Sequence, residues 1–136
     1  MPLPKSEFIW FNGEFVPWDE AKIHVLSHVL HYGTSVFEGI RAYQTPAGPA
    51  ILGLQPHVKR LFNSCKIINM PVPYTQAQIS QAIIATVARN KHNSCYIRPL
   101  VFRGYEVLGV DPRNCPVEVV IAFFMTGTGL HPKNIF

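Results

Sequence analysis

An arginine stands near a glycine and two aromatic residues in one stretch of this sequence, at the two-residue spacing of a β-strand. If residues 37–43 form a strand, one face carries Phe37, Gly39, Arg41 and Tyr43. A guanidinium beside a glycine is unusual in a packed core, and a glycine lets a ligand or another backbone come close. The pattern is therefore compatible with a ligand-binding face. Taken alone, however, it favours a solvated face, which is where most arginines lie.

A second stretch pairs a phenol with a guanidinium in the same way. In a strand over residues 96–102, Tyr96 and Arg98 share a face with Leu100 and Phe102. A phenol and the planar donor fork of arginine, pointing the same way, form a carboxylate-binding pair. Simple exposure of Arg98 to solvent is again the alternative.

Arg60 is a third candidate, one turn into a predicted helix. Its charge adds to the partial positive charge of the helix N-terminus, and both favour an anion such as phosphate. The alternative is an ordinary solvated arginine beside Lys59.

Three histidines invite comparison with a metal site. On a single helix, His24, His28 and His31 would lie on one face, as zinc ligands require. However, Tyr32-Gly33-Thr34 resembles a turn, and no glutamate follows His24 in the manner of a metalloprotease. We therefore expect no metal site.

The elements that must position these residues are readable from turns and caps. Asn12-Gly13 predicts a hairpin turn, Pro56 suits the first position of a helix, and Thr75-Gln-Ala-Gln78 predicts a capping box. Strands are expected over residues 8–11, 14–18, 37–43, 50–54, 96–102 and 117–124, with the two helices between the fourth and fifth. This order predicts an α+β fold, a two-layer sandwich of a mainly antiparallel sheet with two helices packed on one face.

Composition limits the classes of protein. The 136 residues suit one domain. Hydrophobic residues make up 48% of the chain and charged residues 15%, a composition that argues against disorder. So low a charged fraction also predicts that another surface covers part of this one.

No apolar run is long enough to span a membrane. Three widely spaced cysteines predict no disulfide framework and favour a cytoplasmic location. The net charge of +4 is scattered, so we expect a small-molecule partner rather than nucleic acid.

The segment from His31 to Arg41, His-Tyr-Gly-Thr-Ser-Val-Phe-Glu-Gly-Ile-Arg, resembles the signature of the branched-chain amino acid aminotransferases. These are pyridoxal-phosphate enzymes of fold type IV. Further family motifs occur in the family's order, namely Trp10-Phe-Asn-Gly-Glu14, His57-x-x-Arg60-Leu61, Tyr96-Ile-Arg-Pro-Leu100 and Leu108-Gly-Val110. The resemblance runs from about Phe8 to Phe124 and favours this branch over two related activities, D-amino acid aminotransferase and aminodeoxychorismate lyase.

The resemblance implies roles for individual residues. Arg60 would hold the phosphate of pyridoxal 5′-phosphate. Tyr96 and Arg98 would bind the substrate carboxylate or line its site. Phe37, Gly39 and Arg41 would line the same pocket. Tyr32 and Val110 resemble positions that reach the active site of a neighbouring subunit, which implies at least a homodimer. The complete enzyme would transfer an amino group between leucine, isoleucine or valine and 2-oxoglutarate.

The resemblance also predicts what this chain lacks. Family members form a Schiff base with the cofactor through a lysine of a second domain, and no lysine of this sequence stands in such a context. We therefore expect residues 1–124 to be a truncated N-terminal domain, inactive alone, and residues 125–136 to be a divergent tail. The alternative is a non-catalytic domain that has kept only its capacity to oligomerise. The low fraction of charged residues supports it, because exposed apolar surface usually marks an interface.

Overall fold

Seven strands of this protein form one sheet. The computed structural model describes residues 4–91 and 94–125. The strands run in the order β2-β1-β7-β6-β4-β5, β3 also pairs with β6, and every pairing is antiparallel. Their bounds are β1 Phe8–Phe11, β2 Glu14–Pro17, β3 Ser35–Phe37, β4 Ile40–Thr45, β5 Gly48–Ile51, β6 Cys95–Arg103 and β7 Val117–Met125.

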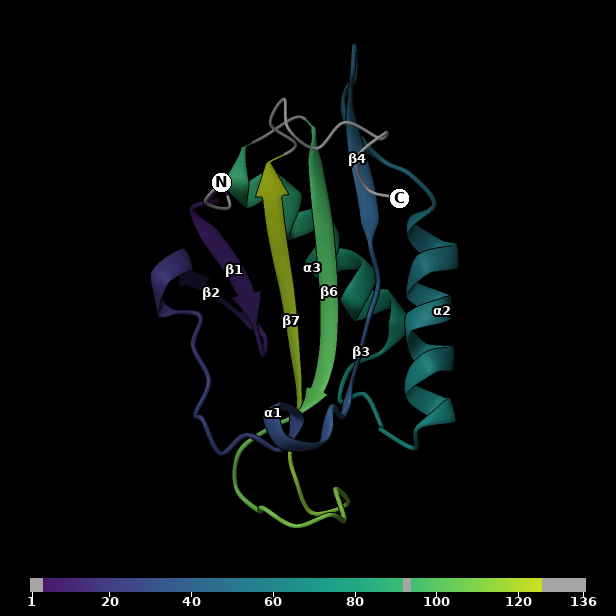
Figure 1. Cartoon of the computed structure of the whole chain (residues 1–136). Coiled ribbons are helices and arrows are strands. Elements are labelled where there is room, and N and C mark those ends of the chain that lie inside the picture. The colour runs from purple at the N-terminus through teal and green to yellow at the C-terminus, as the bar shows by residue number, and fades with distance from the viewer. Residues whose placement is uncertain (1–3, 92–93, 126–136) are drawn as a thin grey trace, which may run out of the picture.

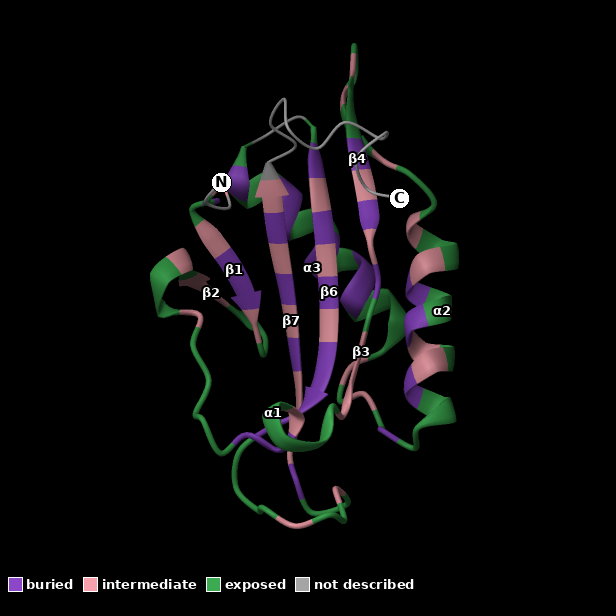
Figure 2. Cartoon of the chain, viewed as in Figure 1, coloured by how far each residue is buried: buried purple, intermediate pink, exposed green. Residues whose placement is uncertain are grey.

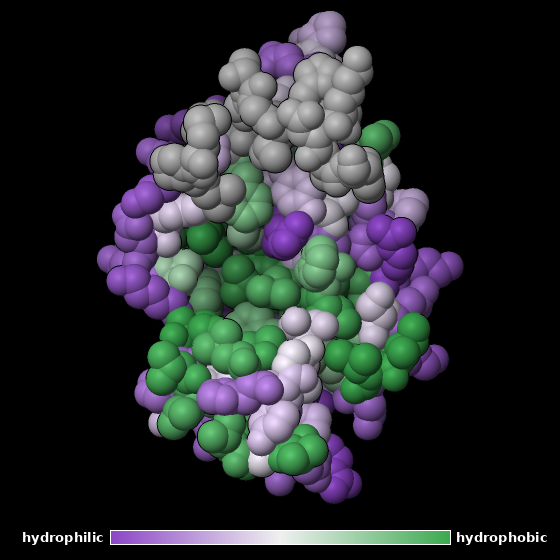
Figure 3. Space-filling model, in the orientation of Figure 1, coloured by the Kyte–Doolittle hydropathy of each residue, from purple (hydrophilic) through white to green (hydrophobic). Residues whose placement is uncertain are grey.

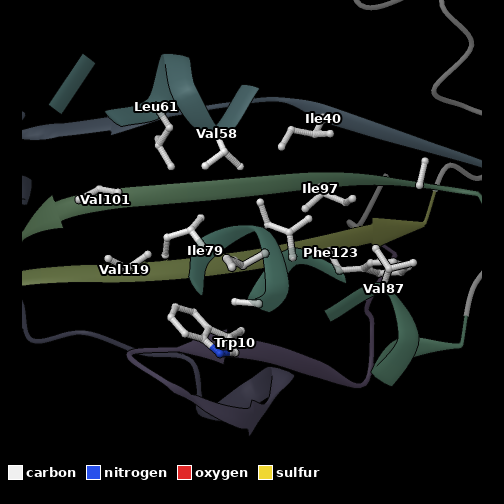
Figure 4. Close-up of a cluster of buried hydrophobic side chains, with 14 of the residues drawn as sticks. Trp10, Ile40, Val58, Leu61, Ile79, Val87, Ile97, Val101, Val119 and Phe123 are labelled. Atoms are coloured by element: carbon white, nitrogen blue, oxygen red, sulfur yellow. The ribbon is translucent and has the colours of Figure 1, made fainter. Parts of the chain in front are cut away.

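The two long helices, α2 (Leu54–Ile67) and α3 (Gln76–Asn90), cover one face of this sheet, and α3 lies behind β6 and β7 in Figure 1. The shorter helices are η1 (Trp18–Glu20) and α1 (His28–Tyr32). Figure 4 shows helical side chains meeting strand side chains between the two layers. The helices contribute Val58, Leu61, Ile79 and Val87, and the strands contribute Trp10, Ile40, Ile97, Val101, Val119 and Phe123. The predicted α+β two-layer architecture is confirmed.

Along the centre of its second face, no helix formed by the described residues covers the sheet (Figure 1). In β6, Ile97 and Val101 are fully buried against the helices, whereas Tyr96, Arg98 and Leu100 are only partly buried. The alternation is visible along β6 and β7 in Figure 2. Strand periodicity therefore correctly predicted that Tyr96 and Arg98 share a face, which we call the open face.

Two helix boundaries test the sequence predictions. The capping box is confirmed, since Thr75 Oγ1 accepts from the Gln78 backbone N–H at 3.1 Å and Gln78 Oε1 accepts from the Thr75 N–H at 2.8 Å. The prediction that Pro56 begins the first helix is wrong, because α2 starts at Leu54, after Gly53 in the left-handed conformation. Arg60 is thus the seventh residue of α2, too far from the N-terminus for its partial charge to matter much.

The predicted continuous strand over residues 37–43 is also wrong. It is broken at Glu38 and Gly39, between β3 and β4. Both flanking segments still pair with β6, through Phe37 opposite Leu100 and Ile40 opposite Ile97. At this break Glu38 directs its carboxylate to α2, as described below. In the same region, the strand expected over residues 50–54 is shifted, because β5 spans Gly48–Ile51 and α2 already begins at Leu54.

None of the helices within residues 4–91 and 94–125 has the length and apolar character needed to cross a membrane. Cys65, Cys95 and Cys115 are buried free thiols. The expected divergent tail, apart from Met125 at the end of β7, lies outside the described residues.

Candidate active site

The open face carries a stacked cluster of one arginine and two aromatic rings. Arg98 Nη2 donates a hydrogen bond to the Tyr96 hydroxyl at 2.8 Å. The guanidinium carbon of Arg98 lies 4.4 Å from the centre of the Phe37 ring and 5.3 Å from that of Tyr96. Stacking on the rings and the hydrogen bond hold the cation in one orientation.

One donor of this cluster lacks a partner among the described residues. The Nε–H group of Arg98 is buried and meets no acceptor there. A buried donor left without an acceptor costs about 1–3 kcal/mol. Because the group is a guanidinium, a carboxylate is the acceptor that suits it best in charge and in shape. The arrangement therefore fits the predicted carboxylate-binding pair.

Gly39 and Arg41 complete the wall beside Tyr96. A Cβ atom on Gly39 would lie 2.9 Å from Cζ of the Tyr96 ring, closer than real Cβ contacts allow. Only glycine therefore leaves room for the phenol at this place. Arg41 stands directly opposite Tyr96 in the pairing of β4 with β6. The structure thus brings five predicted residues together on one face, namely Phe37, Gly39, Arg41, Tyr96 and Arg98.

Arg60 lies on α2 and is held by a buried carboxylate. Its Nε and Nη2 atoms donate to the two oxygens of Glu38, each at 2.7 Å, and His57 Nδ1 lies 2.8 Å from Glu38 Oε2. Glu38 is 5% exposed, whereas the Arg60 side chain is 67% exposed. The Arg60 hydrogen bonds, helped by His57, hold the pKa of Glu38 below its ordinary value although burial opposes this. The same ion pair raises the pKa of Arg60.

Sequence reasoning missed Glu38 and His57 as members of this site. A signal was present, because His57 and Arg60 stand three residues apart and so lie on one face of a helix. Glu38, the one acidic residue of the predicted strand over residues 37–43, was the available partner. Which cation it would meet depends on long-range packing that no local pattern reveals.

Tyr32 and Val110 lie apart from the open-face cluster, on α1 and on the loop between β6 and β7. No hydrogen bond or ring contact within residues 4–91 and 94–125 joins them to Tyr96 or Arg98. Their two segments are joined to each other through His28, whose Nε2 donates to the Gly109 carbonyl at 2.7 Å and whose ring packs 4.5 Å from that of Tyr32.

The two segments together expose a surface that we call the α1-loop patch. His24 stacks on Tyr105 with ring centres 4.2 Å apart, so residues 23–32 and 105–110 lie side by side. The large hydrophobic residues that they expose are Ile23, Val25, Leu26, Leu30, Tyr32, Tyr105, Val107, Leu108 and Val110. Figure 3 shows hydrophobic side chains gathered at the end of the molecule where α1 lies in Figure 1.

The histidines considered for a metal site serve other purposes. His24 precedes α1, so the three do not share a helix. Both ring nitrogens of the buried His28 are engaged, one by Gly109 and one by Thr34 Oγ1 at 2.8 Å. The described ranges contain no group of three residues able to hold a metal ion.

Comparison with known proteins places this arrangement in a family. The sequence model of amino-transferase class IV matches residues 35–132, which include the five clustered residues of the open face and Arg60. The chain belongs to the amino-transferase class IV family. Its class IV relatives include the branched-chain-amino-acid aminotransferase of Pseudomonas aeruginosa, 50% identical over 119 residues, which cover 88% of this chain and 39% of that protein. The Escherichia coli K12 enzyme of the same name is 44% identical, over 96% of this chain and 42% of its own length.

Solved class IV structures agree with the fold. The branched-chain amino acid aminotransferase of Escherichia coli superposes with a TM-score of 0.85 at 45% identity, covering 88% of this chain and 41% of that one. The enzyme of Thermoproteus uzoniensis, solved with norvaline, has a TM-score of 0.85 at 39% identity, over 90% of this chain and 42% of its own. That of Thermobaculum terrenum, solved in its PLP form, has a TM-score of 0.76 at 32% identity, over 88% and 40%. The present chain thus spans about two fifths of the length of the curated relatives that it matches.

Proposed function

We propose that this chain supplies the substrate wall and one phosphate ligand of a pyridoxal-phosphate-dependent branched-chain-amino-acid aminotransferase. The reaction is amino transfer between leucine, isoleucine or valine and 2-oxoglutarate. The observation that carries the proposal is the Arg98–Tyr96–Phe37 cluster on a chain of this family. Its buried Nε donor suits a carboxylate, and the exposed ring of Phe37 beside it suits an aliphatic side chain.

The residues present fit the phosphate of the cofactor. An arginine has five N–H donors, and Arg60 directs two of them at Glu38. Three donors remain for an anion on a side chain that is 67% exposed. When bound, pyridoxal phosphate draws electron density from the carbon that exchanges the amino group. Arg60 would hold the phosphate end of that group, while Arg98 and Tyr96 orient the carboxylate of the amino acid.

The proton transfer of the reaction needs a base, for which the family resemblance implies a lysine. Across the part of the chain that the structure describes, no lysine hydrogen-bonds or pairs with an open-face residue, Glu38 or Arg60, and Lys5 is engaged by Asp19 at 2.8 Å. We therefore propose that the catalytic lysine lies outside this chain and that the chain alone is inactive.

A homodimer is the second element of the proposal. Tyr32 is 45% exposed and Val110 80% exposed within the α1-loop patch. A contiguous apolar surface of this kind marks a protein interface. The patch equally supports the competing hypothesis of an oligomerising domain without catalysis, so activity and assembly need separate tests.

The activity is tested by joining residues 1–124 in frame to the part of the Pseudomonas aeruginosa relative that this chain does not match. The fusion protein is loaded with pyridoxal phosphate and assayed with leucine and 2-oxoglutarate. We expect turnover by the fusion protein and none by the 136-residue chain. In the fusion protein, Arg60→Ala is expected to weaken binding of pyridoxal phosphate more than binding of pyridoxal, which has no phosphate.

Two results would overturn parts of the proposal. A fusion protein that folds, binds the cofactor and leaves leucine unreacted contradicts the proposed activity. Turnover of leucine by the 136-residue chain alone contradicts the proposal that its catalytic lysine lies elsewhere.

A further inference from the structure

Glu38 occupies the break between β3 and β4 and is fixed there by its backbone. Its N–H donates to the Pro99 carbonyl of β6 at 3.0 Å. Its side chain leaves the sheet on the helix side, where it is 5% exposed against α2. A carboxylate this deeply buried must be paired and hydrogen-bonded to be tolerated, and both of its oxygens are engaged.

The contacts of Glu38 fix a side chain that would otherwise move. Arg60 is 67% exposed and, within residues 4–91 and 94–125, forms hydrogen bonds with Glu38 alone. A long exposed arginine has many rotamers. Two parallel hydrogen bonds of 2.7 Å set both the position and the plane of its guanidinium. His57 binds the second oxygen at 2.8 Å and so keeps the carboxylate from rotating.

The residues on either side of Glu38 belong to the opposite face of the sheet. Phe37 stacks on Arg98, and Gly39 makes room for the phenol of Tyr96. One tripeptide therefore connects the arginine on α2 with the cluster on the open face. A change in the position of Glu38 moves these two groups relative to each other.

We infer that Glu38 is a positioning residue, which holds the free donors of Arg60 at a fixed place relative to Phe37 and Gly39 so that a phosphate monoester can bind. This inference rests on the proposed function, in which Arg60 binds the cofactor phosphate. Glu38 itself touches neither phosphate nor substrate in this account.

Glu38 could affect phosphate binding at Arg60 through its charge or by positioning the guanidinium, and the two effects predict opposite changes in phosphate affinity when the carboxylate is removed. A negative charge beside Arg60 lowers the local positive potential, so by charge alone its removal strengthens anion binding. If Glu38 positions Arg60, removal of the carboxylate lets the arginine side chain move, and phosphate must order that side chain when it binds, which weakens binding. Ordering one such side chain corresponds to about a three- to tenfold loss of affinity.

The test uses the whole chain labelled with ¹⁵N and inorganic phosphate as the probe. The Arg60 Nε–H resonance, assigned by its loss in Arg60→Lys, is followed by NMR during titration. Glu38→Gln is expected to weaken phosphate binding by about three- to tenfold and to move this resonance toward that of a mobile arginine. The matched control is Asp111→Asn, since Asp111 binds Arg113 through the same two nitrogen atoms on an exposed loop. It should leave the response of Arg60 unchanged.

The outcomes separate this inference from the function on which it rests. Phosphate that perturbs Arg60 equally or more tightly in Glu38→Gln overturns the inference and leaves Arg60 as the phosphate ligand. Phosphate that does not perturb Arg60 in the unmodified chain overturns both. If Glu38→Gln does not fold, Glu38→Asp replaces it. That variant keeps the charge and shortens the reach, so unchanged phosphate affinity in it also overturns the inference.

Discussion

Gly39 is the residue at which the open face has least room. A methyl group at this position would collide with the Tyr96 hydroxyl and would lie 2.9 Å from Cζ of its ring. The hydroxyl of that ring accepts the hydrogen bond of Arg98. A side chain at Gly39 would therefore displace the phenol and disturb the carboxylate pair through it.

We predict that Gly39→Ala lowers the free energy of unfolding by about 1–3 kcal/mol, the usual cost of overpacking. The matched control is Gly109→Ala, because a Cβ atom at Gly109 meets nothing within 4 Å. It should change stability by less than about 0.5 kcal/mol. Urea denaturation of the two variants decides the matter, and equal effects would contradict the close approach of Tyr96 to Gly39.

The cysteines give a prediction that needs no substitution. Burial raises the pKa of Cys65 to about 11 and that of Cys95 to about 12. The thiolate is the reactive form, so little of it exists at neutral pH. We predict that a thiol-specific reagent at about neutral pH labels the native chain slowly and labels all three cysteines rapidly once urea unfolds it. Rapid labelling of Cys65 or Cys95 in the native chain would count against this packing.

Helix α2 is joined to the sheet by the Glu38 ion pair, so its attachment should depend on pH. The pKa of Glu38 is lowered in the folded chain. Its contribution to stability is therefore complete above the unfolded pKa of about 4.3 and is lost as the pH falls through the lower folded value.

We predict that Glu38→Gln destabilises the chain more at about pH 6 than at about pH 3. At about pH 3, below the unfolded pKa of about 4.3, the carboxyl of the unfolded chain is protonated, so folding to the ion-paired form must release a proton. Thr75→Ala is the control, because it destabilises a helix without removing an ionisable group. It removes the cap of α3 at a cost of about 1 kcal/mol, and that cost should be similar at both pH values. Chemical denaturation at the two pH values measures both effects, and a pH-independent loss in Glu38→Gln would contradict the ion pair.

Features set by local residue spacing could be predicted from the sequence, whereas features set by contacts between distant residues could not. The face shared by Tyr96 and Arg98 and the cap at Thr75 follow from spacings of two or three residues, and both predictions are confirmed. The carboxylate of Glu38, by contrast, is bound by partners 19 and 22 residues away. No local period contains that information, so Glu38 was missed as a member of the site. The link between α1 and Gly109 through His28 spans 81 residues and was missed for the same reason.

At the scale of the whole molecule, the charge-poor composition corresponds to two uncovered surfaces, the open face and the α1-loop patch. The open face carries the candidate site, and the patch carries Tyr32 and Val110. In the proposed enzyme, these surfaces meet the rest of the polypeptide and a second subunit.

We predict that the chain self-associates through the α1-loop patch. Val110→Asp, at a residue 80% exposed, should shift the population toward monomer because a charge cannot be buried in an apolar interface without a partner. Ile67→Asp is the control, since Ile67 is 84% exposed at the end of α2, outside the patch. Sedimentation velocity at several concentrations distinguishes them. A chain that stays monomeric throughout, or equal effects of the two variants, would contradict the prediction.

The central claim is that the open face of this chain binds the carboxylate of a branched-chain substrate. Its most direct test is kcat/KM for leucine in the fusion protein with and without Arg98→Leu. We predict a loss of about 30-fold or more, as expected when one partner of a buried charged hydrogen bond is removed. Unchanged kcat/KM for leucine in a correctly folded Arg98→Leu fusion protein would contradict the account.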